Sequence, residues 1–158
     1  MTGEERARAA AAAMMAADAA SKWFGAELEE VREGYARMGL TVRAEHLNGH
    51  GICHGGVSFA LADSAFAFAC NSRNQRTVAA HDIISFVAPA QAGDRLTAEA
   101  REVVREGRSG IYDVRVTNQH GKVIAELRGF SRTIAGHLFD EEDAAAGQAG
   151  AQREESSA

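Results

Sequence analysis

The stretch LNGHGICHGGVSFALADSAFAFAC, residues 47–70, places a glycine-rich loop directly before a helix that is apolar on every side. Only Ser58, Asp63 and Ser64 interrupt the run of Val, Phe, Ala, Leu and Cys from residue 57 to residue 70. A helix that is apolar all round is buried, and this run falls short of the roughly 18 apolar residues that cross a bilayer. The sequence therefore predicts one buried core helix, around which the remaining chain folds.

Asp63 is the carboxylate inside this apolar helix. Burying an unpaired charge costs free energy, so a functional role is favoured over a structural carboxylate that is tied to a backbone amide. Gly55 and Gly56 stand just ahead of the helix, where free backbone amides at its positive end could bind an anion or a developing oxyanion. The stretch therefore offers a carboxylate and an oxyanion-binding amide.

The length of 158 residues fits one domain with a real core. Residues 140–158 hold six acidic residues and one basic residue, which accounts for the net charge of −5 and leaves residues 1–139 electrically neutral. From His137 onward the chain turns to Ala, Gly, Glu and Ser. We expect one domain over residues 1–139 and an acidic, disordered tail over residues 140–158. The neutral body lacks the broad basic face of a nucleic-acid binder.

The cysteines and the N-terminus indicate a cytoplasmic protein that is not bound to a membrane. Cys53 and Cys70 do not have the spacing of a disulfide framework, which fits a reducing compartment. The alanine run near the N-terminus faintly resembles a signal peptide, but Glu4 and Glu5 precede it and it lacks a leucine-rich core.

The remaining elements follow from composition and periodicity. Residues 4–22 are rich in Ala and Met and predict an N-terminal helix, which residues 23–25 end by packing against the body. Alternating or short apolar runs predict strands over 28–31, 36–42, 78–87, 96–100, 112–116 and 123–127. The strand over 78–87 is apolar on both alternations, as an interior strand would be. Short connections imply an antiparallel sheet, so the fold class is α+β.

The motif HLNGHGICHGGVSFALADSAFAFACNS, residues 46–72, resembles the acyl-CoA thioesterases of the phenylacetic acid degradation branch. The segments SFVAPAQAGDRLTA, residues 85–98, and GRSGIYDVRVTNQHGKVIAELRG, residues 107–129, carry the same resemblance, which extends over about residues 14–135. The resemblance implies the hotdog fold, in which an antiparallel sheet wraps around one long central helix. It also implies acyl-CoA as the substrate, hydrolysis of its thioester and no cofactor or metal.

The same resemblance implies a role for each residue of the motif. Asp63 matches the family's helix carboxylate, which acts as nucleophile or general base. Gly55 matches the glycine whose amide polarises the thioester carbonyl. Asn48, His54 and Ser64 match positions that orient the carbonyl, the water or the carboxylate. Ser64 departs from the family, which often has threonine there, although a hydroxyl is retained.

Elementary chemistry reaches a compatible mechanism. A preorganised amide stabilises the carbonyl oxygen as it gains charge, and Asp63 can attack to form an anhydride or activate water. His54 and Asp63 are nine residues apart, so on one helix they would lie roughly 13 Å apart and on opposite sides. Two antiparallel helices about a twofold axis can bring them together. The site is therefore expected between subunits, and the resemblance implies a homotetramer built as a dimer of dimers.

Substrate contacts are predicted within the motif and in the turn over residues 107–110. Phe59 and Phe66 neighbour Asp63 by helical spacing and would line an acyl slot for phenylacetyl-CoA or its ring-hydroxylated relatives, although such residues are more often core. Gly56 would lie beside the reacting carbonyl. Arg108, followed by Ser109 and Gly110, is the best candidate to bind a CoA phosphate, because glycines let the backbone approach. Solvated strand faces explain most of the other arginines.

Other functions stay open at this point. A non-catalytic acyl-CoA-binding module would tolerate the loss of Asp63, so the presence of that costly residue favours an enzyme. A hotdog hydratase or dehydratase that uses Asp and His on one short segment needs a spacing that is absent here. The string His50 to His54 also suggests haem or zinc, but a second cysteine or further ligands would be required.

Overall fold

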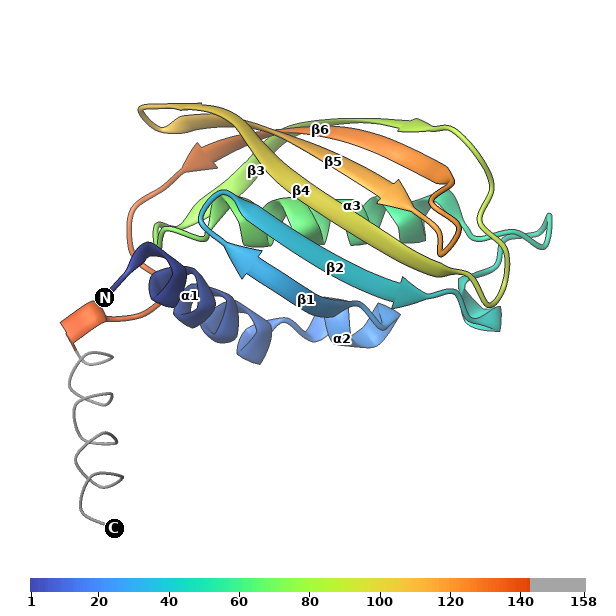
Figure 1. The fold of residues 1–158 in the computed structure, drawn as a ribbon, viewed down its shortest axis with the longest axis horizontal. Helices are drawn as coiled ribbons and strands as arrows, with labels where there is room; N and C mark the ends of the chain where they lie inside the picture. Colours follow the sequence, from blue (N-terminus) through green and yellow to red (C-terminus); the bar gives the residue numbers. More distant parts are fainter. Residues whose placement is uncertain (143–158) are drawn as a thin grey trace, which may run out of the picture.

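The computed structural model describes residues 1–142 and places one long helix, α3 (Gly55–Cys70), against the concave face of an antiparallel sheet (Figure 1). The sheet has six strands in the order β1-β2-β4-β5-β6-β3. The strands are β1 (Glu27–Arg32), β2 (Tyr35–Thr41), β3 (Thr77–Phe86), β4 (Arg95–Glu106), β5 (Ser109–Thr117) and β6 (Val123–Thr133). The predicted antiparallel sheet wrapped around a central helix is confirmed.

The core lies between α3 and the strands that it crosses. Leu61, Phe66 and Phe68 of α3 are at most 1% exposed, and apolar side chains of β2, β4 and β5 cover them. Burying each such side chain contributes about 1.5–3 kcal/mol. Gly129 of β6 makes room for this packing, since a Cβ atom there would lie 2.7 Å from the Phe66 ring. The apolar run of the sequence therefore forms the centre of the fold.

The N-terminal segment forms two helices, α1 (Gly3–Ala17) and α2 (Ala19–Phe24), where the sequence predicted one. Asp18 breaks the helix because its carboxylate accepts hydrogen bonds from the backbone N–H and the hydroxyl of Ser21, at 2.9 and 2.5 Å. Aspartate competes with the helical backbone in this way and favours helix caps over helix interiors. α1 lies beside β1, and α2 lies against α3.

Trp23 corrects a second expectation about this segment. Its side chain is 82% exposed, whereas only Phe24 packs against the core. Gly25 ends α2 in the left-handed conformation, with φ of 83°, which glycine adopts without steric cost. The chain therefore turns toward β1 before the indole can reach the body.

β3 is an edge strand, so the prediction of an interior strand was wrong. It pairs with β6 on one side only. Val78, Ile83 and Phe86 are each about half exposed, at 46%, 56% and 57%. In this protein, a strand with apolar side chains on both of its faces is therefore one whose outer face and free edge are exposed to solvent in the protomer.

The end of the described chain is fixed to the body. The Asn74 side chain accepts hydrogen bonds from the backbone N–H groups of Leu138 and Phe139 and donates one to the Phe139 carbonyl. Glu141 pairs with Arg6 of α1 at 2.7 Å. Residues 137–142 thus contact the body of the domain, and residues 143–158 of the predicted acidic tail lie outside the described residues. No helix within residues 1–142 is long and apolar enough to cross a membrane.

Candidate active site

The first turn of α3 has one free amide. His54 is the N-cap residue, and its Nδ1 atom accepts a hydrogen bond from the Gly56 N–H at 2.8 Å. The Val57 N–H donates to the His54 carbonyl at 2.9 Å. Within residues 1–142 the Gly55 N–H finds no protein acceptor. The Gly55 N–H is therefore free to donate a hydrogen bond, as its predicted role requires. The expectation that the Gly56 amide is also free was wrong, because that amide donates to His54.

The hydrogen bond at His54 also fixes the form of its ring. A neutral imidazole that accepts at Nδ1 carries its proton on Nε2. The His54 side chain is exposed, so this Nε2–H is available as a donor outside the helix. His54 thus acts as a cap and retains a second hydrogen-bonding atom for a ligand.

A cavity of about 370 Å³ opens beside the first turn of α3. Its wall is mostly apolar and consists of Asn48, Ile52, Cys53, Gly55, Ser58, Phe86, Val87, Ala88, Pro89, Ala90 and Ile124. Asn48 shapes the loop, because its Oδ1 atom accepts from the backbone N–H groups of His50 and Ile52 at 2.9 and 3.3 Å. The structure therefore brings the predicted residues Asn48 and Gly55 to one cavity.

The Phe86 ring of β3 lies close against Gly55. A Cβ atom at residue 55 would lie 3.2 Å from that ring, so a side chain there would require the ring to shift by a few tenths of an ångström. Phe86 is a member of this wall that the sequence did not single out. It comes from the end of a strand, 31 residues after Gly55, and local spacing does not connect the two.

Asp63 lies in the middle of α3 and is partly buried. The pKa of its carboxyl is raised to about 6, mainly by burial and in addition by the neighbouring carboxyl of Asp82. Asp63 does not line the cavity at Gly55. The two residues are eight positions apart, which is about 12 Å along a helix, so one protomer does not bring the predicted carboxylate and the predicted amide together.

Asp82 of β3 is a site residue that the sequence did not reveal. Its carboxyl is a neighbour of the Asp63 carboxyl and raises the pKa of that group. The Oδ1 atom of Asp82 is buried and has no hydrogen-bond partner among the described residues. Burial raises the pKa of Asp82 as well. No spacing signal joins these two aspartates, because the sheet brings them together.

Ser64 faces α2. Its hydroxyl lies 3.4 Å from the Ser21 hydroxyl, which in turn donates to Asp18 at 2.5 Å. The resemblance placed Ser64 among the residues that orient the reacting groups. In the protomer it joins a chain of side chains that ties α2 to α3.

The two predicted acyl-slot residues differ in burial. Phe66 is 0% exposed, and its ring centroid lies 5.4 Å from that of Tyr112, so it is part of the core of the protomer. Phe59 is partly buried and packs against the edge of the core. The sequence could not separate the two, because both lie one helical turn from Asp63.

The predicted CoA contacts lie at the opposite end of α3 from Gly55. Arg108 sits in the β4–β5 turn and donates from Nε to the carbonyl of Thr133. Thr133 pairs with Thr77, and Thr77 hydrogen bonds to Asn71, the C-cap residue of α3. Ser109 is exposed, whereas Gly110 is buried. A Cβ atom at residue 110 would lie 2.7 Å from the Ser131 hydroxyl.

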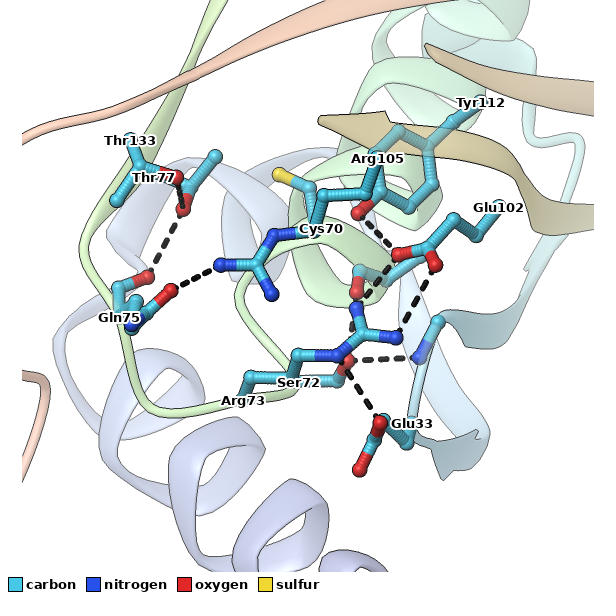
Figure 2. Close-up of polar contacts among 12 residues, drawn as sticks. Glu33, Cys70, Ser72, Arg73, Gln75, Thr77, Glu102, Arg105, Tyr112 and Thr133 are labelled. Atoms are coloured by element: carbon cyan, nitrogen blue, oxygen red, sulfur yellow. Dashed lines mark hydrogen bonds and ion pairs between the residues drawn. The ribbon is translucent and has the colours of Figure 1, made fainter. Parts of the chain in front are cut away.

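Figure 2 shows two arginines at this end, Arg73 and Arg105, which have different partners. Arg73 is engaged in ion pairs with Glu33 and Glu102 at 3.0 and 2.5 Å. Arg105 contacts the neutral side chain of Gln75. Within residues 1–142, the arginines near the end of β6 that form no ion pair with an acidic side chain are Arg76, Arg105, Arg108 and Arg132. We call these four residues the basic cluster.

The two cysteines are poor candidates for a reactive nucleophile. Cys53 and Cys70 are free and buried. Burial raises the pKa of the Cys70 thiol to about 12, and the neighbouring Asp63 charge adds to this effect, so its reactive thiolate is scarce near neutral pH. In the part of the chain that the structure describes, no three His, Cys, Asp or Glu side chains are grouped to hold a metal ion.

Comparison with known proteins places this site in a family. The sequence profile of the Thioesterase superfamily matches residues 50–125. The acyl-coenzyme A thioesterase PaaI of Escherichia coli (strain K12) is 44% identical over 129 residues, which cover 82% of this chain and 92% of that protein.

Two solved structures agree with this assignment. The structure of the E. coli PaaI protein from the phenylacetic acid degradation operon has a TM-score of 0.85 at 42% identity, covering 86% of this chain and 99% of that chain. A mutant of the phenylacetic acid degradation protein PaaI from Thermus thermophilus has a TM-score of 0.70 at 37% identity, covering 72% and 97%. The chain therefore belongs to the Thioesterase superfamily, in the branch that contains the PaaI proteins.

Proposed function

We propose that the protein hydrolyses acyl-CoA thioesters to a free acid and CoA, with phenylacetyl-CoA and ring-hydroxylated phenylacetyl-CoAs as preferred substrates. The observation that carries the proposal is the pair formed by the Asp63 carboxylate in apolar α3 and the unpaired Gly55 amide at the N-terminus of α3. The name of the E. coli relative, an acyl-coenzyme A thioesterase, supports the same reaction.

The chemistry assigns one step to each group. The Gly55 N–H binds the thioester carbonyl oxygen as it becomes an oxyanion, and one such donor contributes about 3–4 kcal/mol. Asp63 takes a proton from a water molecule, and the water oxygen attacks the carbonyl carbon. The oxyanion then re-forms the carbonyl, the C–S bond breaks, and the CoA thiolate takes the proton from Asp63.

Water activation is favoured over direct attack by Asp63. A carboxylate whose pKa is raised to about 6 is a better base near neutral pH than an ordinary aspartate. Single-turnover hydrolysis in ¹⁸O water tests this choice. General-base catalysis leaves Asp63 unlabelled, whereas an anhydride that water opens at the aspartyl carbon transfers ¹⁸O to its carboxyl group.

The complete site is proposed to form between two copies of the chain. Gly55 and Asp63 are about 12 Å apart along α3, and the open edge of β3 carries the exposed apolar residues Val78 and Ile83. Two copies that join along β3 would set their α3 helices antiparallel, so that Asp63 of one subunit approaches Gly55 of the other. A homotetramer of two such dimers is the proposed assembly, and two buried free thiols fit a cytoplasmic location.

The basic cluster is the proposed contact for the phosphates of CoA. Arg108 and Ser109 lie at its exposed turn, and Arg132 pairs in register with Ser109 on the neighbouring strand. Arginines without acidic partners are suited to phosphate, which their planar guanidinium groups bind through two hydrogen bonds. Because the cluster and Gly55 lie at opposite ends of α3, this proposal also requires the antiparallel pair of subunits.

The preference for an aromatic acyl group rests on the cavity beside Gly55. Phe86, Val87 and Ile124 form its apolar wall, and an aromatic contact adds about 0.5–1.5 kcal/mol beyond burial. This difference corresponds to roughly tenfold discrimination. The names of the two solved relatives, which refer to phenylacetic acid degradation, point to the same substrate class.

A thiol-release assay over a panel of acyl-CoAs tests the proposal. Phenylacetyl-CoA should have a higher kcat/KM than acetyl-CoA or palmitoyl-CoA, with short and medium acyl-CoAs as secondary substrates. If acetyl-CoA or palmitoyl-CoA exceeds every aromatic substrate, the substrate class is wrong. Asp63→Asn should lose more than about 90% of kcat/KM, a change of about 1.4 kcal/mol or more, and a smaller loss would contradict the role of Asp63.

A further inference from the structure

The cavity beside Gly55 has an exposed rim and a buried floor. Phe86 and Val87 form the rim and are 57% and 60% exposed. The floor consists of lining residues that are each at most 7% exposed, namely Cys53, Ser58, Ala90 and Ile124. A cavity of about 150 Å³ holds benzene, and this one has about 370 Å³. An aromatic acyl group that enters past the rim therefore meets this floor with its ring.

Ser58 brings a hydroxyl group to this floor. Its Oγ atom donates to the carbonyl of Gly55, one turn earlier on α3, at 3.1 Å. This bond uses the hydroxyl proton and fixes the side chain, whereas the oxygen can still accept a hydrogen bond. No donor within residues 1–142 bonds to that oxygen. Ser58 thus holds an unused acceptor in the wall of the cavity.

Ser72, just beyond the other end of α3, shows the same geometry with both capacities used. Its hydroxyl donates to the carbonyl of Ala69, three residues earlier, at 2.7 Å, and it accepts the Gly34 N–H at 2.9 Å. The protein itself therefore supplies the donor that Ser58 lacks. Because buried polar atoms normally find partners, the vacant acceptor of Ser58 indicates a donor that arrives with a ligand.

The other polar side chains of the wall do not offer an equivalent acceptor. The Oδ1 atom of Asn48 already accepts two backbone N–H groups of its own loop, so its amide presents the Nδ2 donor. The sulfur of Cys53 is a weak acceptor, and its thiol is directed to the His54 carbonyl at 3.7 Å. Among the side chains of this wall, Ser58 therefore provides the oxygen that can receive a proton donor.

We infer that Ser58 accepts a hydrogen bond from a hydroxyl group on the acyl ring and thereby makes the enzyme prefer ring-hydroxylated phenylacetyl-CoAs over phenylacetyl-CoA. This inference rests on the proposed function for the substrate class. Without such an acceptor, a hydroxylated ring would bury a donor that has no partner, which costs free energy. One neutral hydrogen bond corresponds to about two- to tenfold discrimination.

The test is a competition assay in which the protein hydrolyses phenylacetyl-CoA together with its 2-, 3- or 4-hydroxy derivative. Wild type should prefer at least one hydroxylated isomer by about two- to tenfold in kcat/KM. The fluoro analogue of that isomer has no proton to donate and should show no such preference. Ser58→Ala should bring the ratio of the two kcat/KM values to about one. Ser72→Ala, which removes a buried hydroxyl outside the cavity, is the matched control and should retain the wild-type ratio.

Failure of this inference and failure of the proposed function give different results. A preference that persists in Ser58→Ala, or a wild type that prefers none of the three isomers, overturns the inference while thioester hydrolysis stands. If wild type hydrolyses no acyl-CoA, the proposed function fails, and calorimetric dissociation constants of the same acyl-CoAs decide the inference. It is then overturned unless a hydroxylated isomer binds wild type more tightly than phenylacetyl-CoA does and Ser58→Ala abolishes the difference.

A second variant keeps the test independent of the folding of Ser58→Ala. Ser58→Cys retains a side chain of similar size and replaces the oxygen by a weakly accepting sulfur. It should lose the same preference for the hydroxylated isomer. A wild-type ratio in Ser58→Cys would contradict the role of the Ser58 oxygen.

Discussion

The Nδ1 atom of His54 accepts the Gly56 N–H at 2.8 Å and thereby caps α3 while its neighbour Gly55 keeps a free amide. One of the orphan donors of the first turn is thus satisfied by the protein and another is left for a ligand. Capping at this position also excludes one alternative, in which the Gly56 amide would compete for the substrate oxygen.

His54→Ala and His54→Asn should separate the two roles of this residue. Alanine removes the cap, which typically costs about 1 kcal/mol, so we expect the melting temperature to fall by about 2–4 °C. Asparagine is a good N-cap residue and should restore most of that stability. Both variants lose the Nε2–H donor, so both should lose kcat/KM if His54 contacts the substrate. Full activity of His54→Asn would show that the cap is its whole contribution.

Asp63→Asn should stabilise the protein, and the gain should depend on pH. The folded pKa of about 6 lies above the unfolded value of about 4, so between these values the unfolded chain releases a proton that the folded chain retains. Wild-type stability therefore falls as the pH rises from about 4 to 6 and stays lowered above that. We expect the melting temperature of the variant to exceed that of wild type by about 2 °C or more at pH 7.5.

Calorimetry of both proteins at two pH values checks this sign. Near pH 4 the wild-type carboxyl is protonated in the folded state, and the difference in melting temperature should shrink toward zero. A variant that is less stable than wild type at pH 7.5 would mean that the Asp63 charge is compensated in the folded protein.

Mixed oligomers should test whether the site is shared between subunits. Asn48→Ala and Asp63→Ala homo-oligomers should each be inactive. A heterodimer of the two has one site in which both Asn48 and Asp63 are intact, so activity should return to up to about half of the wild-type value per dimer. Purification with two different affinity tags isolates the heterodimer, and an inactive verified heterodimer would place the whole site within one subunit.

Arg108→Gln should weaken the binding of CoA without affecting the chemical step. We expect KM for phenylacetyl-CoA to rise several-fold with kcat unchanged, because the contact lies far from the reacting carbonyl. An N-acetylcysteamine thioester of the same acid lacks the phosphates and should be hydrolysed equally by variant and wild type. Arg115→Gln is the control, since Arg115 pairs with Glu126 on β6; a similar rise in KM there would argue against the basic cluster.

Local pattern predicts most of the fold because strand and helix periodicity is a property of neighbouring residues. Both the apolar run of α3 and the alternation in β2 follow from it directly. The break at Asp18 was also readable, since Asp18 and Ser21 have the spacing of a helix cap. The edge position of β3 was not readable, because apolar residues on both alternations look alike whether a strand is covered by its own chain or left open.

The candidate site was predicted only where its residues are neighbours in sequence. Gly55 and Asn48 reach the same cavity because one loop carries both. Phe86 and Asp82 were missed because they lie on β3, which only the folding of the sheet places beside α3, and neither residue belongs to a recognisable motif. Phe66 was assigned to substrate on helical spacing, but spacing gives the turn of the helix and leaves open which face the sheet covers.

The exposed side chain of Trp23 provides an intrinsic fluorescence probe for contacts made by α2. It is the single tryptophan of the chain and is 82% exposed on α2, so its indole is already hydrated in the folded protomer. Unfolding would therefore change its fluorescence emission very little. A subunit or ligand that covered α2 would shift the emission to shorter wavelength, and the same signal would leave contacts elsewhere on the surface unrecorded.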